Sequence, residues 1–301
     1  MRILFPSWPG ERRVDAAFEG ELEAARAAGF EVGFVDVELH LGGEARLWNA
    51  GPGPALYRGW LLKPDDYARL AEGVAARGGA LLTTADDYRH ASDFPRWYEA
   101  LAGTTPRSVW FRAGDLDALM PAIPAALVDT FGSGASLLLK DFVKSRKQDW
   151  YDACFIRDVA DEDNVRRVIR NFLELQGDAF TGGLVFREFI ALRRVGVHPK
   201  SRMPLVNEWR FFVAQGKVVY HAPYWSDGAS YEGLAPPEIH DVERLVAGVK
   251  LPFFAVDLAE REVGGWAVIE INDGGTAGVP DGGSVAAFYE ALRGAPCETP
   301  R

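Results

Sequence analysis

The stretch WAVIEINDGG, residues 266–275, is the most informative part of this sequence. Its apolar and polar residues alternate, which is typical of a β-strand with two different faces. In such a strand Ile269 and Ile271 point to one face, which we expect to be core. Glu270 and Asn272 then share the other face. An acid and an amide at successive positions of one face are either an ordinary solvent-exposed surface or a pair of oxygen ligands.

The segment before this strand favours oxygen ligands. Residues 253–273 form a hairpin if the turn is centred on residues 263–264, and this register places Asp257 directly across from Glu270. Two carboxylates in such positions repel each other, so the pair needs a cation. Mg²⁺ prefers oxygen ligands and often completes its coordination with substrate phosphates. We therefore predict Asp257, Glu270 and Asn272 as metal ligands. A solvated acidic strand face is the alternative, and a shift of the register by one residue would separate the pair.

A second hairpin is expected in NEWRFFVAQGKVVYH, residues 207–221. A two-residue turn at residues 215–216 would place Arg210 opposite His221. Glu208 and Arg210 would share one face of their strand, because they are two residues apart. This makes His221 a candidate substrate contact beside Arg210, with an ordinary core or surface position as the alternative.

Positive charge is concentrated upstream of these hairpins. In LLLKDFVKSRKQDW, residues 137–150, an apolar strand is followed by basic residues. Lys140, Lys144 and Lys147 lie close together there, and the later segment VFREFI adds Arg187. Lysine is a compact point charge that suits phosphate oxygens. These residues are candidates for phosphate binding, and a solvated basic loop is the alternative.

The first part of the chain has a different organisation. Over roughly the first hundred residues, apolar strand patterns alternate with amphipathic helix patterns, which indicates a parallel α/β domain. After it, strands joined by antiparallel hairpins dominate, which indicates α+β structure. The segment YRGW, residues 57–60, ends a strand of the first domain, where open α/β sheets bind ligands. Arg58 is therefore a candidate for holding a substrate carboxylate in a bidentate pair, with an ordinary loop arginine as the alternative.

Composition excludes several classes of protein. The 301 residues are 48% hydrophobic and 25% charged, with a net charge of −10, so a nucleic-acid partner is not expected. Two cysteines are too few for a disulfide framework, and five histidines without metal-ligand spacing indicate no zinc site. No apolar run reaches the ~18 residues of a membrane span, and the N-terminus does not resemble a signal peptide. We expect a cytoplasmic protein without a membrane partner.

Taken in order, these motifs resemble those of the ATP-grasp ligases. Lys140 on a strand, VFREFI, NEWRFFV, and Asp257 with the later EIN occur in the family's order. The resemblance covers nearly the whole chain and is closest to a bacterial and phage clade rich in lysine and arginine at the phosphate site. It implies an α/β plus α+β fold, with a pre-ATP-grasp α/β domain at residues 1–105. Two α+β subdomains, at residues 106–183 and 184–301, would hold ATP between them.

The resemblance also implies roles for individual residues. The positions similar to nucleotide contacts are Lys140, Ser145, Glu188, Phe189, Ile190 and Glu208. The positions similar to residues that act on the transferred phosphoryl group are Lys144, Lys147, Arg187 and Arg210. The metal ligands would be Asp257, Glu270 and Asn272. Residues 141–150 would form a mobile loop over the phosphates. The family's earlier nucleotide-binding lysine has no match here, and Arg96 and Arg107 are the alternatives for it.

The function implied by the resemblance is that of an ATP-dependent carboxylate–amine ligase. Such an enzyme uses ATP and Mg²⁺, forms an acylphosphate and releases ADP and phosphate. Its substrates would be a carboxylate and an amine, either small molecules or peptides. A small-molecule kinase and a nucleotide-binding regulator without turnover are the alternatives. The sequence indicates neither the two substrates nor the oligomeric state.

Overall fold

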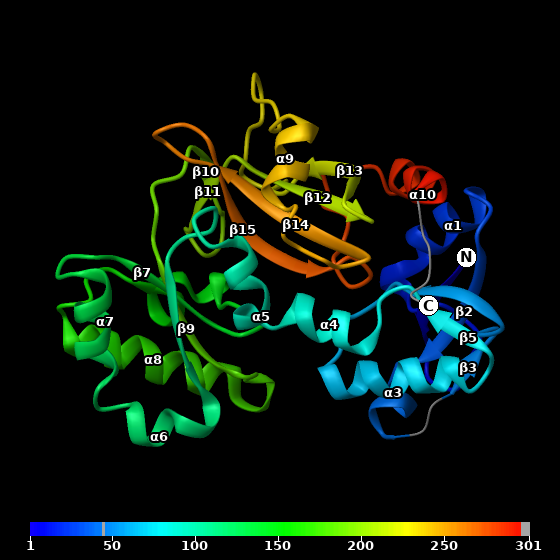
Figure 1. The fold of residues 1–301 in the computed structure, drawn as a ribbon, viewed down its shortest axis with the longest axis horizontal. Helices are drawn as coiled ribbons and strands as arrows, with labels where there is room; N and C mark the ends of the chain where they lie inside the picture. Colours follow the sequence, from blue (N-terminus) through cyan, green and yellow to red (C-terminus); the bar gives the residue numbers. More distant parts are fainter. Residues whose placement is uncertain (44–45, 296–301) are drawn as a thin grey trace.

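The computed structural model describes residues 1–43 and 46–295. Three main β-sheets, with helices around them, make up the molecule (Figure 1). We call them the N-terminal sheet, the middle sheet and the third sheet. No helix in the described ranges is long and apolar enough to cross a membrane.

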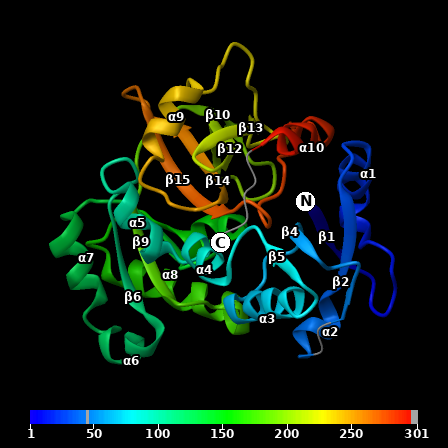
Figure 2. The same cartoon turned by 45° about the vertical axis from the view of Figure 1, so that its right-hand side comes forward.

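The N-terminal sheet has five strands in the order β3-β2-β1-β4-β5. Its strands are β1 (Arg2–Ser7), β2 (Glu31–Asp36), β3 (Leu47–Trp48), β4 (Gly53–Tyr57) and β5 (Gly79–Leu81). All neighbours pair in parallel except β2 and β3. Helices α1 (Glu19–Ala27) and α3 (Pro64–Ala75) pack on opposite faces of the sheet, and α2 (Val37–Leu41) follows β2 (Figure 2). The predicted parallel α/β unit is confirmed, with β3 as an additional short strand.

The middle sheet has four antiparallel strands in the order β6-β9-β7-β8. They are β6 (Ser108–Arg112), β7 (Leu137–Asp141), β8 (Phe155–Ile156) and β9 (Gly183–Glu188). Helices α6 (Leu116–Leu119), α7 (Ile123–Phe131) and α8 (Glu162–Gln176) pack on one face. Asp161 caps the N-terminus of α8, because its side chain accepts a hydrogen bond from the amide of Asn164.

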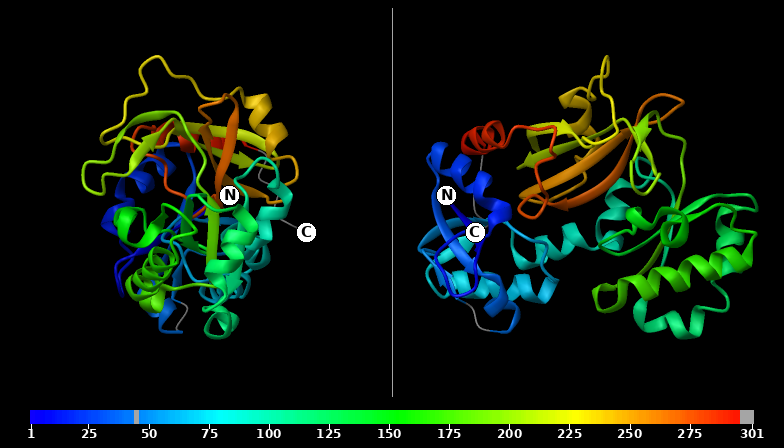
Figure 3. Two further views of the ribbon diagram at one scale, coloured as in Figure 1. Left: turned by 90° about the vertical axis from the view of Figure 1, so that its left-hand side faces the viewer. Right: turned by 180° about the vertical axis from the view of Figure 1, so that it is seen from behind.

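The third sheet lies above the middle sheet when the molecule is seen from behind (Figure 3). Its order is β13-β12-β14-β15, and all its strands are antiparallel. The strands are β12 (Glu208–Ala214), β13 (Lys217–Pro223), β14 (Phe253–Glu260) and β15 (Trp266–Asp273). A small hairpin, β10 (Arg194–Val197) and β11 (Pro204–Val206), precedes it, and helices α9 (Ile239–Leu245) and α10 (Val285–Gly294) belong to the same part of the chain.

Helices α4 (Ala85–Ser92) and α5 (Phe94–Tyr98) connect the N-terminal sheet to the middle sheet. Phe94 and Trp97 of α5 pack in the same core as Phe211 of β12 and Val256 of β14. This core covers one face of the third sheet. The opposite face of the sheet packs against α1 and α10 at one end only, around Phe212. The other end of that face carries the polar residues described below. The remaining single turns of helix are Ala16–Phe18, Glu99–Leu101, Ala113–Asp115, Lys147–Asp149, Trp150–Cys154 and Gly177–Ala179.

The register of the last hairpin is as predicted at the acid pair, because Asp257 lies opposite Glu270. Beyond this pair, a β-bulge makes Ile269 an extra residue, since Leu258 pairs with Val268. The bulge reverses the alternation on β15. Val268 and Ile271 are therefore in the core, whereas Ile269 lines a cavity. The prediction that Ile269 is a core residue was wrong for this reason.

The register of the β12–β13 hairpin differs from the prediction. The turn is at Gln215 and Gly216, both with positive φ, as a tight hairpin turn requires. A bulge near Phe212 then shifts the pairing by one residue. Arg210 lies opposite Ala222, so the predicted pairing of Arg210 with His221 was wrong. A bulge changes which residues face the core, and nothing in either strand's sequence marked its position.

Candidate active site

The centre of the candidate site is the acid pair on the partly open face of the third sheet. Arg210 of β12 donates from Nε and Nη2 to the two carboxylate oxygens of Asp257, both at 2.8 Å. Lys140 reaches across from β7 of the middle sheet, and its Nζ is 2.5 Å from Oε1 of Glu270. Each carboxylate therefore has its own cation, which relieves the repulsion between the two acids. The two halves of the site are joined through the contact between Lys140 and Glu270.

The charges of the two lysines keep Glu270 ionised. Burial opposes ionisation, but the charges of Lys140 and Lys147 outweigh it and lower the pKa of Glu270 to about 2. Lys147 lies on the short helix after β7, with its Nζ 5.6 Å from the Tyr224 ring and 5.5 Å from the Trp225 ring. Burial alone would lower the pKa of Lys147, but its neighbours, including the nearby carboxylates, raise it. The site therefore holds a fixed cluster of opposite charges.

Glu208 is a buried carboxyl group at the edge of this cluster. Its Oε2 accepts a hydrogen bond from Nε1 of Trp225 at 3.0 Å. Its Oε1 is buried and has no hydrogen-bond partner among the described residues. Burial raises the pKa of Glu208 to about 7, although Lys147 and Arg210 act in the opposite direction. A buried oxygen without a partner indicates room for a donor from a ligand.

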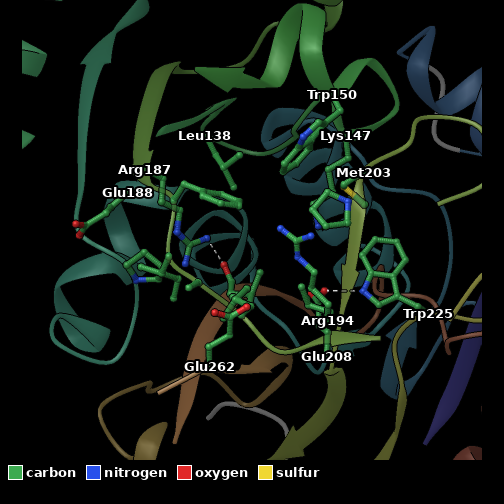
Figure 4. Close-up of a pocket in the computed structure, with 18 residues that line it drawn as sticks. Leu138, Lys147, Trp150, Arg187, Glu188, Arg194, Met203, Glu208, Trp225 and Glu262 are labelled. Carbon is green, nitrogen blue, oxygen red and sulfur yellow. Dashed lines mark hydrogen bonds between the residues drawn. The ribbon is translucent and has the colours of Figure 1, made fainter. Parts of the chain in front are cut away.

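A cavity of about 230 Å³ opens beside Glu208, between the middle and third sheets (Figure 4). Its walls are mostly apolar, with Leu138 of β7 and Ile269 of β15 among them. Lys147 and Glu208 are among its polar lining residues. Mostly apolar walls with a few polar groups are typical of sites for a small molecule or a cofactor.

The segment after β9 forms one edge of the cavity. Glu188, Phe189 and Ile190 all line it. The amide of Glu188 donates to Arg107 O at 2.8 Å, and that of Phe189 donates to Ser136 O at 2.9 Å. Within the described part of the chain, the amide of Ile190 has no hydrogen-bond acceptor. This edge can therefore offer a backbone donor to a ligand in the cavity.

Arg187 is placed differently from the expectation. Its Nη1 donates to the carbonyl of Ile269, and its Nη2 donates to Val268 O at 2.8 Å and to Thr105 Oγ1 at 2.6 Å. Burial lowers its pKa to about 10, although nearby carboxylates oppose this shift. Arg187 lines the cavity, but these contacts use two of its nitrogens to hold the bulge of β15.

The remaining predicted residues lie near the cluster without joining it. Lys144 and Ser145 are in the turn after β7, where Ser145 forms a bridge with Lys140. Lys144 lines a separate crevice of about 170 Å³ next to the N-terminal sheet. Asn272 follows Glu270 by two residues on β15, opposite Ala255. Groups of three or more His, Cys, Asp or Glu side chains arranged for a metal are absent from residues 1–43 and 46–295. The predicted set differs from such a group in having two acids and an amide.

Arg58 is not available to a substrate, so this prediction was wrong. Its guanidinium is buried and donates from Nε and Nη2 to the carboxylate of Glu21, at 2.6 and 3.0 Å. Its Nη1 donates to the carbonyls of Gly274, Gly275 and Ala277. Through these hydrogen bonds, Arg58 connects the end of β4 and helix α1 to the loop after β15.

His221 does not join the candidate site either. It lies opposite Phe211, and its ring is 5.2 Å from the Phe211 ring and 5.9 Å from the Trp209 ring. These aromatic residues belong to the core on the far face of the third sheet. Burial among them lowers the pKa of His221. The shifted register of β13 is the reason for this placement.

Several residues that line the cavity were missed. They are Pro106, Leu138, Trp150, Ala191, Leu192, Arg194, Met203, Pro204, Val206, Trp225, Glu262 and Ile269. Arg194 is notable because its guanidinium points into the cavity (Figure 4). Its side chain forms no hydrogen bond or salt bridge with the residues that the structure describes. The only sequence signal was the pair Arg193 and Arg194 close after Glu188, Phe189 and Ile190.

Comparison with known proteins supports the family resemblance. The family model for the ATP-grasp domain, R2K clade family 3, matches residues 130–292. No curated protein sequence matches the chain. Among solved structures, the chain is similar to D-cycloserine synthetase DcsG, with a TM-score of 0.62, 15% identity, and coverage of 98% of this chain and 99% of that chain. An ATP-grasp RimK domain protein from Sphaerobacter thermophilus DSM 20745 has a TM-score of 0.59, 19% identity, and coverage of 97% and 98%.

A third similar structure is that of the ATP-grasp ligase PsnB in complex with a minimal precursor, Mg and ADP. Its TM-score is 0.55 with 16% identity, and the match covers 96% of each chain. At these identities the structures show the fold alone, which extends over nearly the whole chain. The family model and the fold agree: this chain belongs to the ATP-grasp domain family, R2K clade family 3.

Proposed function

We propose that this protein is an ATP-dependent carboxylate–amine ligase that forms an amide or peptide bond through an acylphosphate. The observation that carries the proposal is the charge cluster beside the apolar cavity. Asp257 and Glu270, each paired with its own cation, lie next to Lys147 and Glu208, which line the cavity. An apolar slot next to concentrated cations and hard oxygens suits a nucleotide with its phosphates.

The nucleotide has a defined orientation in this proposal. The base lies between the apolar side chains of Leu138 and Ile269. An acceptor atom on the edge of the base receives a hydrogen bond from the backbone amide of Ile190. The phosphates then extend toward Lys140 and Lys147. Arg194 points into the same cavity and contributes a further positive charge to nucleotide binding.

The residues present fit Mg²⁺ as the metal. Asp257 and Glu270 supply carboxylate oxygens, and Asn272 on the same strand supplies an amide oxygen. The low pKa of Glu270, about 2, keeps that carboxylate in the ionised form that a metal ligand needs. Bound there, Mg²⁺ would neutralise negative charge on the terminal phosphates. Arg210 and Lys140 orient the two carboxylates through their hydrogen bonds.

Positioning and electrostatics then account for the chemistry. An oxygen of the substrate carboxylate attacks the γ-phosphorus, and the bond to the β-phosphate oxygen breaks, so ADP leaves with the electron pair. The cations of Lys140, Lys144, Lys147 and Arg210 stabilise the charge that develops on the phosphoryl oxygens. The amine then attacks the acyl carbon, phosphate leaves, and the nitrogen loses a proton.

We also propose that the chain is divided into a pre-ATP-grasp domain at residues 1–105 and two ATP-grasp subdomains at residues 106–183 and 184–301. The similar structures support a ligase, since DcsG is a synthetase and PsnB is a ligase that was solved with its precursor. The acid and the amine are small molecules or peptides.

The decisive experiment supplies Mg²⁺ and ATP with a panel of carboxylates and measures ADP and phosphate. With the correct acid and no amine, hydroxylamine should trap the acylphosphate as a hydroxamate. With ¹⁸O in the carboxylate, the label should appear in the released phosphate. A stable phosphorylated product that retains the label would instead identify a kinase. ATP binding without turnover of any acid would identify a regulator, and AMP as the primary product would exclude the proposed mechanism.

A further inference from the structure

Asp141, the last residue of β7, is fully buried and makes four hydrogen bonds through its carboxylate. Oδ1 accepts from the amides of Val143 at 2.7 Å and Lys144 at 2.5 Å. Oδ2 accepts from Nε2 of Gln176 at 2.8 Å and from the amide of Thr181 at 3.3 Å. All four donors are neutral. A buried carboxylate is unfavourable without such bonds, so its presence here fixes local geometry.

The geometry that it fixes is the turn of residues 141–145. The amide of Asp141 donates to Lys144 O at 2.9 Å, and Ser145 forms a bridge back to Lys140. Gln176 ends α8, and Thr181 lies just before β9, so the turn is anchored on two regular elements. The first half of the segment expected to be a mobile loop is thus held in one place.

This turn is in contact with the charge cluster. The Nζ of Lys140 is 3.5 Å from Val143 O and 2.5 Å from Oε1 of Glu270. The position of the turn therefore helps to set the position of the Lys140 ammonium group. It also sets the backbone of Lys144, whose amide is one of the four donors. A flexible lysine side chain delivers its charge to a defined place only if its backbone is fixed.

From these contacts we propose that Asp141 is a positioning residue for the lysine turn, which it holds so that Lys144 and Lys140 meet the phosphates of the nucleotide. This inference rests on the proposed function, because it concerns the same nucleotide site. Asp141 itself is buried beneath the turn and acts through the backbone that it binds.

The test uses the full chain and its affinity for Mg²⁺-ATP, measured by calorimetry. Asp141→Asn replaces one carboxylate oxygen by an amide NH₂ group. This group is a donor, so it cannot accept the two hydrogen bonds that the oxygen accepted. We expect Asp141→Asn to weaken binding by about tenfold, because an ordered turn must form at the moment of binding. The matched control is Asp158→Asn, since Asp158 also accepts from two backbone amides, those of Gly134 and Ala160, in a turn away from the cavity. The control should bind ATP as the wild type does.

A double-mutant cycle separates this role from general destabilisation. Because Lys144 is one of the two lysines that Asp141 positions, Asp141→Asn should lower the affinity by a smaller factor in a Lys144→Ala background than in the wild type. An equal loss in both backgrounds, or unchanged affinity in Asp141→Asn, would overturn the proposal. If Asp141→Asn does not fold, Gln176→Leu removes one of the four bonds and leaves the acid in place. Gln176→Leu should then produce a smaller loss of affinity, reduced further in Lys144→Ala, and the absence of any loss would again overturn the proposal.

The controls also separate the two proposals. A wild-type protein that does not bind Mg²⁺-ATP would contradict the proposed function. A wild-type protein that binds it, with no effect of Asp141→Asn, would contradict only the role of Asp141. Limited proteolysis gives an independent measurement, because residues 141–145 should be resistant in the apo wild type and cleaved in Asp141→Asn.

Discussion

Replacing Arg58 by Met should strongly destabilise the protein. The side chains of Arg58 and Glu21 are only 2% and 13% exposed, and their two hydrogen bonds are 2.6 and 3.0 Å long. Arg58→Met leaves the Glu21 carboxylate buried, with the hydroxyl of Tyr289 as its remaining donor. Removing one member of a buried ion pair typically costs about 3–5 kcal/mol. Urea unfolding at pH 7, followed by tryptophan fluorescence, should show a loss of this size.

The second variant tests the cause of that loss. Arg58→Met combined with Glu21→Gln removes both charges, so the uncompensated charge is gone. We expect this double variant to recover all but about 1–2 kcal/mol, the part that reflects lost hydrogen bonds from Nη1 to carbonyls such as that of Ala277. Arg89→Met is the matched control, because the partner of Arg89, Asp65, is 86% exposed, and such surface pairs contribute less than about 1 kcal/mol. This reasoning would be refuted if the single and double variants had equal free energies of unfolding. It would also be refuted if Arg58→Met lost less stability than Arg89→Met.

Three further predictions concern the site. Asp257→Asn should abolish Mg²⁺-dependent ATP turnover while near-UV circular dichroism stays unchanged, and retained turnover would exclude Asp257 as a metal ligand. Arg194→Ala should raise the KM for ATP by about tenfold, the size expected for one charge-assisted contact. Arg193→Ala is its control, since Arg193 pairs with Glu260 outside the cavity, and equal KM values for both variants would remove Arg194 from the nucleotide site. The pKa of Glu208 is raised from 4.5 to about 7, so the folded protein binds a proton that the unfolded chain lacks, and stability should fall as the pH rises through that window. Glu208→Gln should reduce this pH dependence and leave the part due to Asp273, whose pKa burial raises to about 6. A variant with the full wild-type profile would show that Glu208 does not contribute.

The acid pair was predictable from the sequence because its determinants are local. A strong alternation in the strand and a glycine-containing turn set the pairing of Asp257 with Glu270, and the structure has that pairing. The same reasoning failed for Ile269 and His221, one bulge away in each hairpin. The order of the motifs along the chain was enough to indicate the family, since it does not depend on the register of any single strand.

Other parts of the site depend on contacts between distant segments. The partner of Arg58 is 37 residues away on a helix, so a strand-end arginine looked free in the sequence. The cation for Glu270 comes from Lys140, 130 residues earlier, and no pattern in either strand indicates that pairing. Arg194 is on a short hairpin whose placement over the cavity follows from the tertiary fold alone.

The contacts of Arg187 determine how the molecule can open. This one side chain from the middle sheet binds the carbonyls of Val268 and Ile269 in the third sheet, and Thr105 Oγ1 donates to Val268 O at 3.0 Å beside it. These hydrogen bonds therefore connect the middle sheet to the third sheet at this point. A rotation that separates the two sheets leaves this point almost still and is largest far from it. We therefore expect a ligand to enter and leave on the side away from Arg187, while the distances next to the β15 bulge change least.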